Sequence, residues 1–134
     1  MPKAYKLGAY KQDTSAANCY QAGTVLSGAN LYSTLERPDG VNLSAVPAGK
    51  TWYLTRIMVA GGTAGTYAEI GYGDSAVHNS VSAPTNAQKL SRVIGVAAAD
   101  TIVDKDIFIA IPAGKYPFIF ATGSMRVHVE YVEE

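Results

Sequence analysis

The stretch MRVHVEY at residues 125–131 decides the fold class, because apolar and polar side chains alternate along it without a break. Successive side chains of a β-strand point to opposite faces of its sheet. The alternation therefore directs one set toward a core and the other toward solvent, as in a half-buried strand. The inward set is Met125, Val127, Val129 and Tyr131, and the outward set is Arg126, His128 and Glu130.

Four more stretches predict strands, and one favours a helix. Residues 51–60 (TWYLTRIMVA) and 106–111 (DIFIAI) are rich in β-branched and aromatic residues and apolar on both faces. Such runs are typical of central or covered strands. Residues 118–121 predict a short strand, and residues 67–72 (YAEIGY) predict a weaker one whose internal glycine marks a bulge. Residues 86–93 (NAQKLSRV) favour a helix, which would be marginal on its own at about two turns.

Turn residues fall between the apolar runs, and one turn sequence occurs twice. Residues 46–50 and 111–115 both carry an apolar residue followed by Pro-Ala-Gly-Lys, and an aromatic stretch follows each. Proline cannot donate to a continuing ladder and glycine adopts conformations that other residues resist, so each copy predicts a chain reversal. Two such corners fit the long connections of a jelly roll or Greek key, although a common turn can also recur by chance.

Short strands with dense turn signals indicate an all-β protein, an antiparallel β-sandwich or barrel of jelly-roll or Greek-key type. The 134 residues fit a single domain. We place its sandwich core at residues 41–134. Residues 1–40 hold scattered tyrosines and weak β-segments, which predicts an extended N-terminal arm. Tyrosines are costly to leave in water, so Tyr5 and Tyr10 are candidate partner-binding residues; a frayed terminus is the alternative.

Charge is scarce and balanced in this chain. Eleven basic and eleven acidic residues give a formal net charge of zero, and neither sign forms a run. Binders of nucleic acid or anionic membranes need concentrated Lys and Arg, so we expect neither as a partner. Charged residues make up 16%, against about 25% in typical soluble domains. So little charge favours burial of the surface against identical copies or a larger assembly.

The sequence also lacks the signals for export and membrane insertion. No apolar segment follows the basic residues near Met1, so a signal peptide is not expected. No apolar stretch approaches the roughly 18 residues of a spanning helix. We therefore expect a protein that is made and folded in a cytoplasm.

No motif predicts catalysis, a cofactor or a metal site. Residues 49–51 (GKT) match the end of a phosphate-binding loop, but Ser44 stands where that loop needs glycine and a β-pattern follows. Cys19 is the single cysteine, which excludes an internal disulfide and favours a small buried hydrophobe. Asp100, Asp104 and Asp106 are interleaved with Lys105 and apolar residues, which favours a solvated turn over a calcium site.

The histidines and aromatic residues are predicted to be structural. His128 alternates onto the solvent face of the last strand, and Trp52 is expected in the core. His78 lies in a polar loop, residues 74–80, whose hydroxyls and carboxylate could assemble a nucleophile, a base and an orienting acid. No nucleophile elbow of the form Gly-x-Ser-x-Gly occurs, so we expect no enzyme.

The repeated turns ahead of aromatic strands, the low charge and the acidic end (Glu130, Glu133 and Glu134) resemble small β-sandwich virion accessory proteins of tailed bacteriophages, such as capsid decoration proteins. The resemblance covers residues 41–134. It implies a jelly-roll-like homo-oligomer, often a trimer, on the virion surface after assembly in the host cytoplasm. Its partners would be the major capsid protein or other virion subunits, and it would act without chemistry or cofactors.

A carbohydrate-binding or receptor-binding module of a phage fibre is the alternative function. Nine tyrosines and one tryptophan could supply rings for stacking on sugars. This alternative predicts exposed aromatic side chains grouped on one sheet face or loop end. A cementing protein would instead place its apolar surface at subunit contacts.

Overall fold

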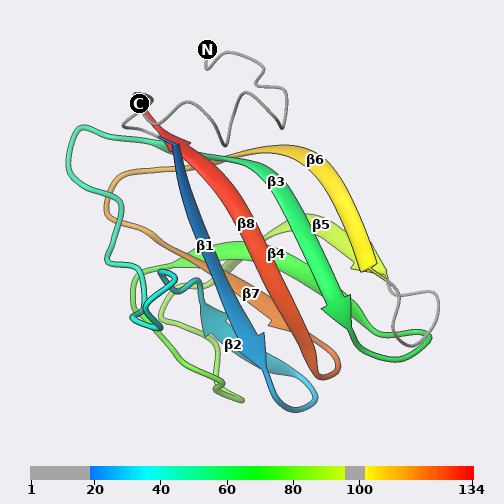
Figure 1. Ribbon diagram of the computed structural model, residues 1–134. Helices are drawn as coiled ribbons and strands as arrows, with labels where there is room; N and C mark the ends of the chain where they lie inside the picture. Colours follow the sequence, from blue (N-terminus) through cyan, green and yellow to red (C-terminus); the bar gives the residue numbers. More distant parts are fainter. Residues whose placement is uncertain (1–18, 96–101) are drawn as a thin grey trace.

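The computed structural model describes residues 19–95 and 102–134, without the side chains of residues 19, 20 and 91–94. All regular secondary structure in these residues is β-strand, which confirms the predicted fold class (Figure 1). The strands are β1 (Cys19–Leu26), β2 (Leu31–Thr34), β3 (Trp52–Gly61), β4 (Tyr67–Gly73), β5 (Gln88–Gly95), β6 (Ile102–Ile111), β7 (Tyr116–Ala121) and β8 (Met125–Glu133).

The strands form two four-stranded antiparallel sheets, which we name sheet A (β1-β8-β3-β6) and sheet B (β2-β7-β4-β5). Each strand pairs with its counterpart counted from the other end of the series: β1 with β8, β2 with β7, β3 with β6 and β4 with β5. Pairings of β3 with β8 and of β4 with β7 complete the sheets. This winding is that of a jelly roll, and Figure 1 shows sheet A in front of sheet B.

The core lies between the two sheets and follows the alternation read from the sequence. Every inward residue of β8 is at most 5% exposed, whereas Arg126 on the opposite face is exposed. The inward residues of β8 are Met125, Val127, Val129 and Tyr131. Trp52 also lies in the core, 4.8 Å from the ring of Tyr131, and its Nε1 donates to Glu133 Oε2 at 2.8 Å.

The two Pro-Ala-Gly-Lys sequences take the same conformation and lie against each other. In each turn the lysine N–H donates to the proline carbonyl, and the glycine has a positive φ, 75° at Gly49 and 81° at Gly114. Val46 joins the copies: its N–H donates to Lys115 O at 2.9 Å, and its carbonyl accepts from Gly114 at 2.8 Å. The repeat therefore builds one paired corner, from which β3 and β7 start.

Two local predictions are wrong. Residues predicted as a helix at 86–93 contain most of β5, which pairs with β4. Pairing along a whole strand outweighs the weak helical preference of a segment about two turns long. Asp104 and Asp106 lie inside β6 and not in a turn before it, because β6 starts at Ile102 and both aspartates fit the outward positions of its alternation. Asp100 lies outside the described residues.

The N-terminal part of the described chain belongs to the sandwich. β1 is an edge strand of sheet A and β2 is an edge strand of sheet B, so both sheets include residues before position 41. Tyr5 and Tyr10 lie outside the described residues, as does the side chain of Cys19.

Candidate functional site

Three edge strands of the sandwich, β1, β2 and β6, offer little to a partner strand. Gly23 and Glu36 exchange backbone hydrogen bonds, so the chain after β2 covers the edge of β1. Tyr32 and Ser80 exchange two more, which covers the edge of β2. At the edge strand β6, the exposed Lys105 occupies an inward position of the alternation. A charge at such a position opposes pairing with another strand.

The outer face of sheet B is sealed by the protein itself. Its rings form one cluster, in which Tyr32 lies 5.6 Å from Phe118 and 4.7 Å from Phe120. The ammonium of Lys89 lies 3.8 Å from the centroid of Phe120, in cation–π geometry. Phe118 is 0% exposed and Phe120 only 9%. The two phenylalanines of this face therefore leave almost no surface for a ligand, while Tyr32 is partly exposed.

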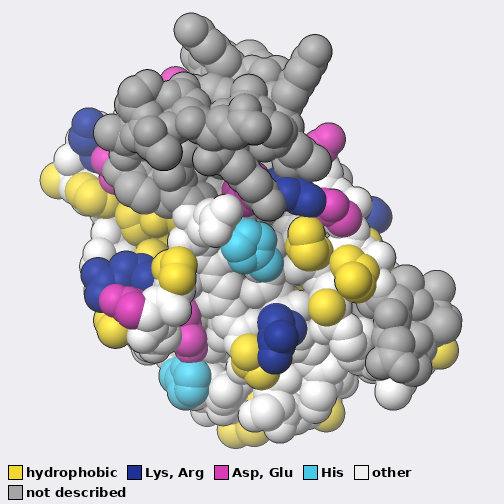
Figure 2. Space-filling model, viewed as in Figure 1, with side chains coloured by type: hydrophobic (Ala, Val, Ile, Leu, Met, Phe, Trp, Pro, Cys, Tyr) yellow, Lys and Arg dark blue, Asp and Glu magenta, His cyan; other side chains and the backbone are white. Residues whose placement is uncertain are grey.

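The outer face of sheet A is organised in rows, because cross-strand partners in β1, β8, β3 and β6 stand side by side. Figure 2 views this face, with hydrophobic side chains over β3 and β6 and a histidine and a basic side chain near its middle. In strand order, the rows are Val25, Arg126, Ala60 and Ile102; Gly23, His128, Met58 and Asp104; Gln21, Glu130, Arg56 and Asp106.

A stacked pair of aromatic rings lies on this face, and Phe108 is the more exposed of the two. Tyr53 and Phe108 stack with 5.2 Å between ring centroids and 18° between planes. Phe108 is 52% exposed, and Ile102 on the same strand is 65% exposed. Exposed apolar side chains on one face of a strand mark a contact surface more often than single scattered ones do.

Three charged residues cross-link the middle of the face. Arg56 donates to both carboxylate oxygens of Asp104, at 2.9 and 2.6 Å, and to Glu130 Oε1 at 3.1 Å. The hydrogen bonds to Asp104 raise the pKa of Arg56, against the opposing effect of desolvation. Glu130, predicted on the solvent side, is only 1% exposed. This cluster joins β6, β3 and β8, and its charges are committed to one another.

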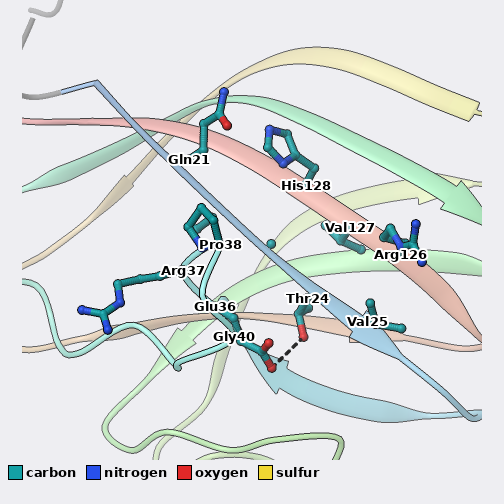
Figure 3. Close-up of a pocket in the computed structure, with 12 residues that line it drawn as sticks. Gln21, Thr24, Val25, Glu36, Arg37, Pro38, Gly40, Arg126, Val127 and His128 are labelled. Carbon is teal, nitrogen blue, oxygen red and sulfur yellow. Dashed lines mark hydrogen bonds between the residues drawn. The ribbon is translucent and has the colours of Figure 1, made fainter. Parts of the chain in front are cut away.

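Two shallow hollows meet at Val25 and Arg126, which line both of them. The larger, about 410 Å³, continues over Ala60, Gly61 and Ser124. The smaller, about 320 Å³, runs between β1, β8 and residues 36–40. Figure 3 shows the smaller hollow, with Arg126 beside Val25. Together the hollows and the aromatic pair make the outer face of sheet A the candidate binding site.

His78 does not form a nucleophile–base pair in the described structure. Its Nδ1 lies 2.7 Å from Glu36 Oε1, and Thr24 Oγ1 donates to the same oxygen at 3.5 Å. Thr24 in turn shares a hydrogen bond of 2.9 Å with Ser33. The carboxylate therefore stands between the imidazole and the hydroxyls, whereas a hydroxyl nucleophile needs the imidazole in the middle. Ser33 is 0% exposed and Thr24 only 5%.

The His78–Glu36 contact joins the two segments that cover the edges of β1 and β2, so its evident role is structural. The sequence singled out His78 but gave no sign of Glu36, because only the folding of the two cover segments brings them together. The sequence likewise gave no sign of the Tyr53–Phe108 pair, since stacking across β3 and β6 depends on their register.

Metal-binding groups, membrane-spanning helices and similar proteins give no further information about the function. No group of three His, Cys, Asp or Glu side chains suited to hold a metal ion occurs among the described residues. Within the same residues, no helix is long and apolar enough to cross a membrane. A scan of the sequence against models of known protein families gave no match, and a search of curated proteins found no similar sequence.

Proposed function

We propose that this protein is a non-enzymatic structural protein of a virion, a decoration protein that binds an assembled capsid through the outer face of sheet A. The observation that carries the proposal is the contrast between the two sheet faces. Phe108 and Ile102 are 52% and 65% exposed on sheet A, whereas Phe118 and Phe120 on sheet B are 0% and 9% exposed. A protein that seals one aromatic face and leaves the other open has a surface suited to a partner.

The described site favours binding over chemistry. Its hollows are shallow, and the charges of Arg56, Asp104 and Glu130 are bonded to one another. A cementing function needs only that the protein binds the assembled shell better than free subunits, because a ligand specific for one state stabilises that state. The virion setting is supported by the sequence resemblance to phage accessory proteins.

The proposal includes association with identical copies, with a trimer favoured. A charge-poor chain with an open apolar face gains by burying that face. Light scattering at high protein concentration should therefore give a mass that is a multiple of 14.1 kDa. A monomer at every concentration would refute this part of the proposal.

Co-sedimentation with purified capsids that lack the protein tests the binding face. We expect Phe108→Ser to weaken binding by roughly tenfold or more, because truncating a well-packed aromatic contact removes a hot spot. The matched control is Val81→Ser, since Val81 is 78% exposed but lies in the connection between β4 and β5, away from sheet A. Equal binding by Phe108→Ser and the wild type, or no sedimentation of the wild type, would contradict the proposal.

A carbohydrate-binding or receptor-binding role is the second candidate, and the stacked Tyr53–Phe108 pair favours it. Aromatic faces pack against the apolar side of sugar rings, and a neighbouring carboxylate such as Asp106 can accept hydrogen bonds from hydroxyls. A glycan array separates the two candidates. Binding of a defined glycan that Phe108→Ser abolishes would favour this role, and a blank array beside intact capsid binding would favour decoration.

A further inference from the structure

We propose that Arg126 is the anchor of a docking site for an extended, acidic segment of a partner protein. The inference rests on the proposed function and names the chemistry of the partner. The segment would place one carboxylate on the Arg126 guanidinium and lay apolar side chains in the hollows on either side.

The pairing of charges sets Arg126 apart. The guanidinium of Arg37 lies 2.9 Å from Asp39, and that of Arg56 is held by Asp104 and Glu130. Arg126 is exposed and has no carboxylate partner among the described residues. A guanidinium binds a carboxylate through two parallel hydrogen bonds, which are among the stronger polar contacts in proteins.

The position of Arg126 matters as much as its charge. It stands between Val25 and Ala60 in its row and lines both hollows. Val25 is 49% exposed, so apolar surface flanks the charge. An Arg amid apolar surface is the composition found at the centre of binding hot spots. A charged group on open surface would contribute much less.

The shape of the site favours an extended peptide. Side chains two residues apart in an extended chain point the same way and are separated by roughly 6.6 Å. If a Glu or Asp contacts Arg126, the residues two before and two after it point toward the same face, one over each hollow. The expected pattern is therefore apolar, any residue, Asp or Glu, any residue, apolar. Of the two arginines that line the hollows, Arg37 is paired with Asp39, which leaves Arg126 to bind the partner. One guanidinium does not suit a nucleic acid or a lipid surface, which need several cations.

Selection of peptides from a random display library on the purified wild-type protein tests the inference without capsids. We expect the acidic-centred pattern among the selected peptides. Arg126→Gln should weaken binding of a selected peptide by about tenfold or more, the effect of losing a charge-assisted hydrogen-bond pair. Replacing the central Glu of the peptide by Gln should have a similar effect on the unaltered protein, which does not depend on the folding of a variant.

Lys50→Gln is the matched control, because Lys50 is an exposed basic residue in the turn before β3 and lines neither hollow. This control should bind within about twofold of the wild type, since an exposed charge away from the contact contributes little. Selected peptides without a fixed acid, an empty selection, or equal binding of the Glu and Gln peptides would each overturn the inference.

Capsid co-sedimentation separates this inference from the proposed function. Capsids that bind wild type and Arg126→Gln equally, but lose Phe108→Ser, would leave decoration standing and overturn the role of Arg126. If peptide binding depends on Arg126 but the wild-type protein does not bind capsids, the docking site is supported and the decoration function is rejected.

Discussion

Gly71 shows how a single missing side chain permits the packing of sheet B. A Cβ at this position would collide with the carbonyl oxygen of Gln88 and lie 2.6 Å from Cζ of Phe118. The β4–β5 register shifts between Ile70 and Gly71, which confirms the bulge predicted at the glycine of YAEIGY. The glycine therefore allows both the irregular pairing with β5 and the burial of Phe118 on the outer face.

Gly71→Ala should lower the free energy of unfolding by about 1–3 kcal/mol, since overpacking forces neighbours away from their places. Gly95→Ala is the control, because no atom of the described residues lies within 4 Å of a Cβ there. Its effect should stay within about 0.5 kcal/mol. Urea denaturation of the three proteins measures both changes, and equal stability of the two variants would show that the packing around Gly71 is looser than described.

Asp74 gives the protein a pH-dependent contact. Its carboxylate accepts from Lys115 at 2.5 Å and from Asn86 at 2.8 Å. These bonds, that from Lys115 first, hold the pKa of Asp74 below its ordinary value. A lowered pKa in the folded state gives stability that is complete above the pKa of the unfolded carboxyl, about 3.9. That stability is lost as the pH falls through the folded pKa.

Asp74→Asn should therefore flatten the acid side of the stability profile. Between about pH 5 and pH 2 the free energy of unfolding should fall in both proteins, and it should fall less in the variant than in the wild type. Urea denaturation midpoints at a series of pH values measure this difference. If the stability of the variant falls as steeply with pH as that of the wild type, the Asp74–Lys115 contact contributes nothing to stability in solution.

At the scale of elements, Arg56 links three strands of sheet A through Asp104 and Glu130. The Arg56 side chain is 10% exposed and that of Glu130 is 1% exposed. Glu130 Oε2 is buried and has no hydrogen-bond partner within the part of the chain that the structure describes. Charges this well buried depend on their counter-ion, because water no longer solvates them.

Arg56→Met should destabilise the protein by about 3–5 kcal/mol, since it leaves Glu130 as an uncompensated buried charge. The double variant Arg56→Met, Glu130→Met should be more stable than the single one, although it removes more polar groups. Chemical denaturation of Arg56→Met, of Glu130→Met and of the double variant gives the coupling energy between the two residues. If the losses of unfolding free energy in the two single variants add up to the loss in the double variant, the ion pair does not contribute to stability.

Strands with a regular pattern of apolar residues could be predicted from the sequence. Strands that depend on pairing with a neighbouring strand could not. β8 follows from the alternation at residues 125–131, and β3 from its aromatic and β-branched run. β5 was wrongly predicted as a helix because the residues of NAQKLSRV have mixed preferences, and only pairing with β4 decides between the two states. The start of β6 at Ile102 was missed because charged residues interrupt its apolar pattern.

At the scale of the whole molecule, the jelly roll gives the protein two outer faces with opposite properties. The sequence shows aromatic residues in both β6 and β7, but not that Phe118 is buried while Phe108 is open. Burial depends on what covers a strand, which only the assembled fold determines. For this reason the sequence gave no sign of the candidate site on sheet A. The prediction that Tyr5 and Tyr10 bind a partner concerns residues outside the described structure and stays a prediction.

Deleting residues 1–12 tests the predicted role of Tyr5 and Tyr10. Both sheets should persist, since β1 begins at Cys19, and a β-type circular-dichroism spectrum with cooperative unfolding would show this. Binding to capsids should weaken. Loss of folding on truncation would refute the idea of a partner-binding arm.

We propose that the outer face of sheet A contacts the partner. Cryo-electron microscopy of capsids carrying this protein observes that orientation directly. We expect a jelly roll seated with β1, β8, β3 and β6 against the shell, and with Phe108 and Arg126 at the contact. A jelly roll seated on sheet B, with Phe108 facing solvent and no neighbouring subunit, would contradict the account.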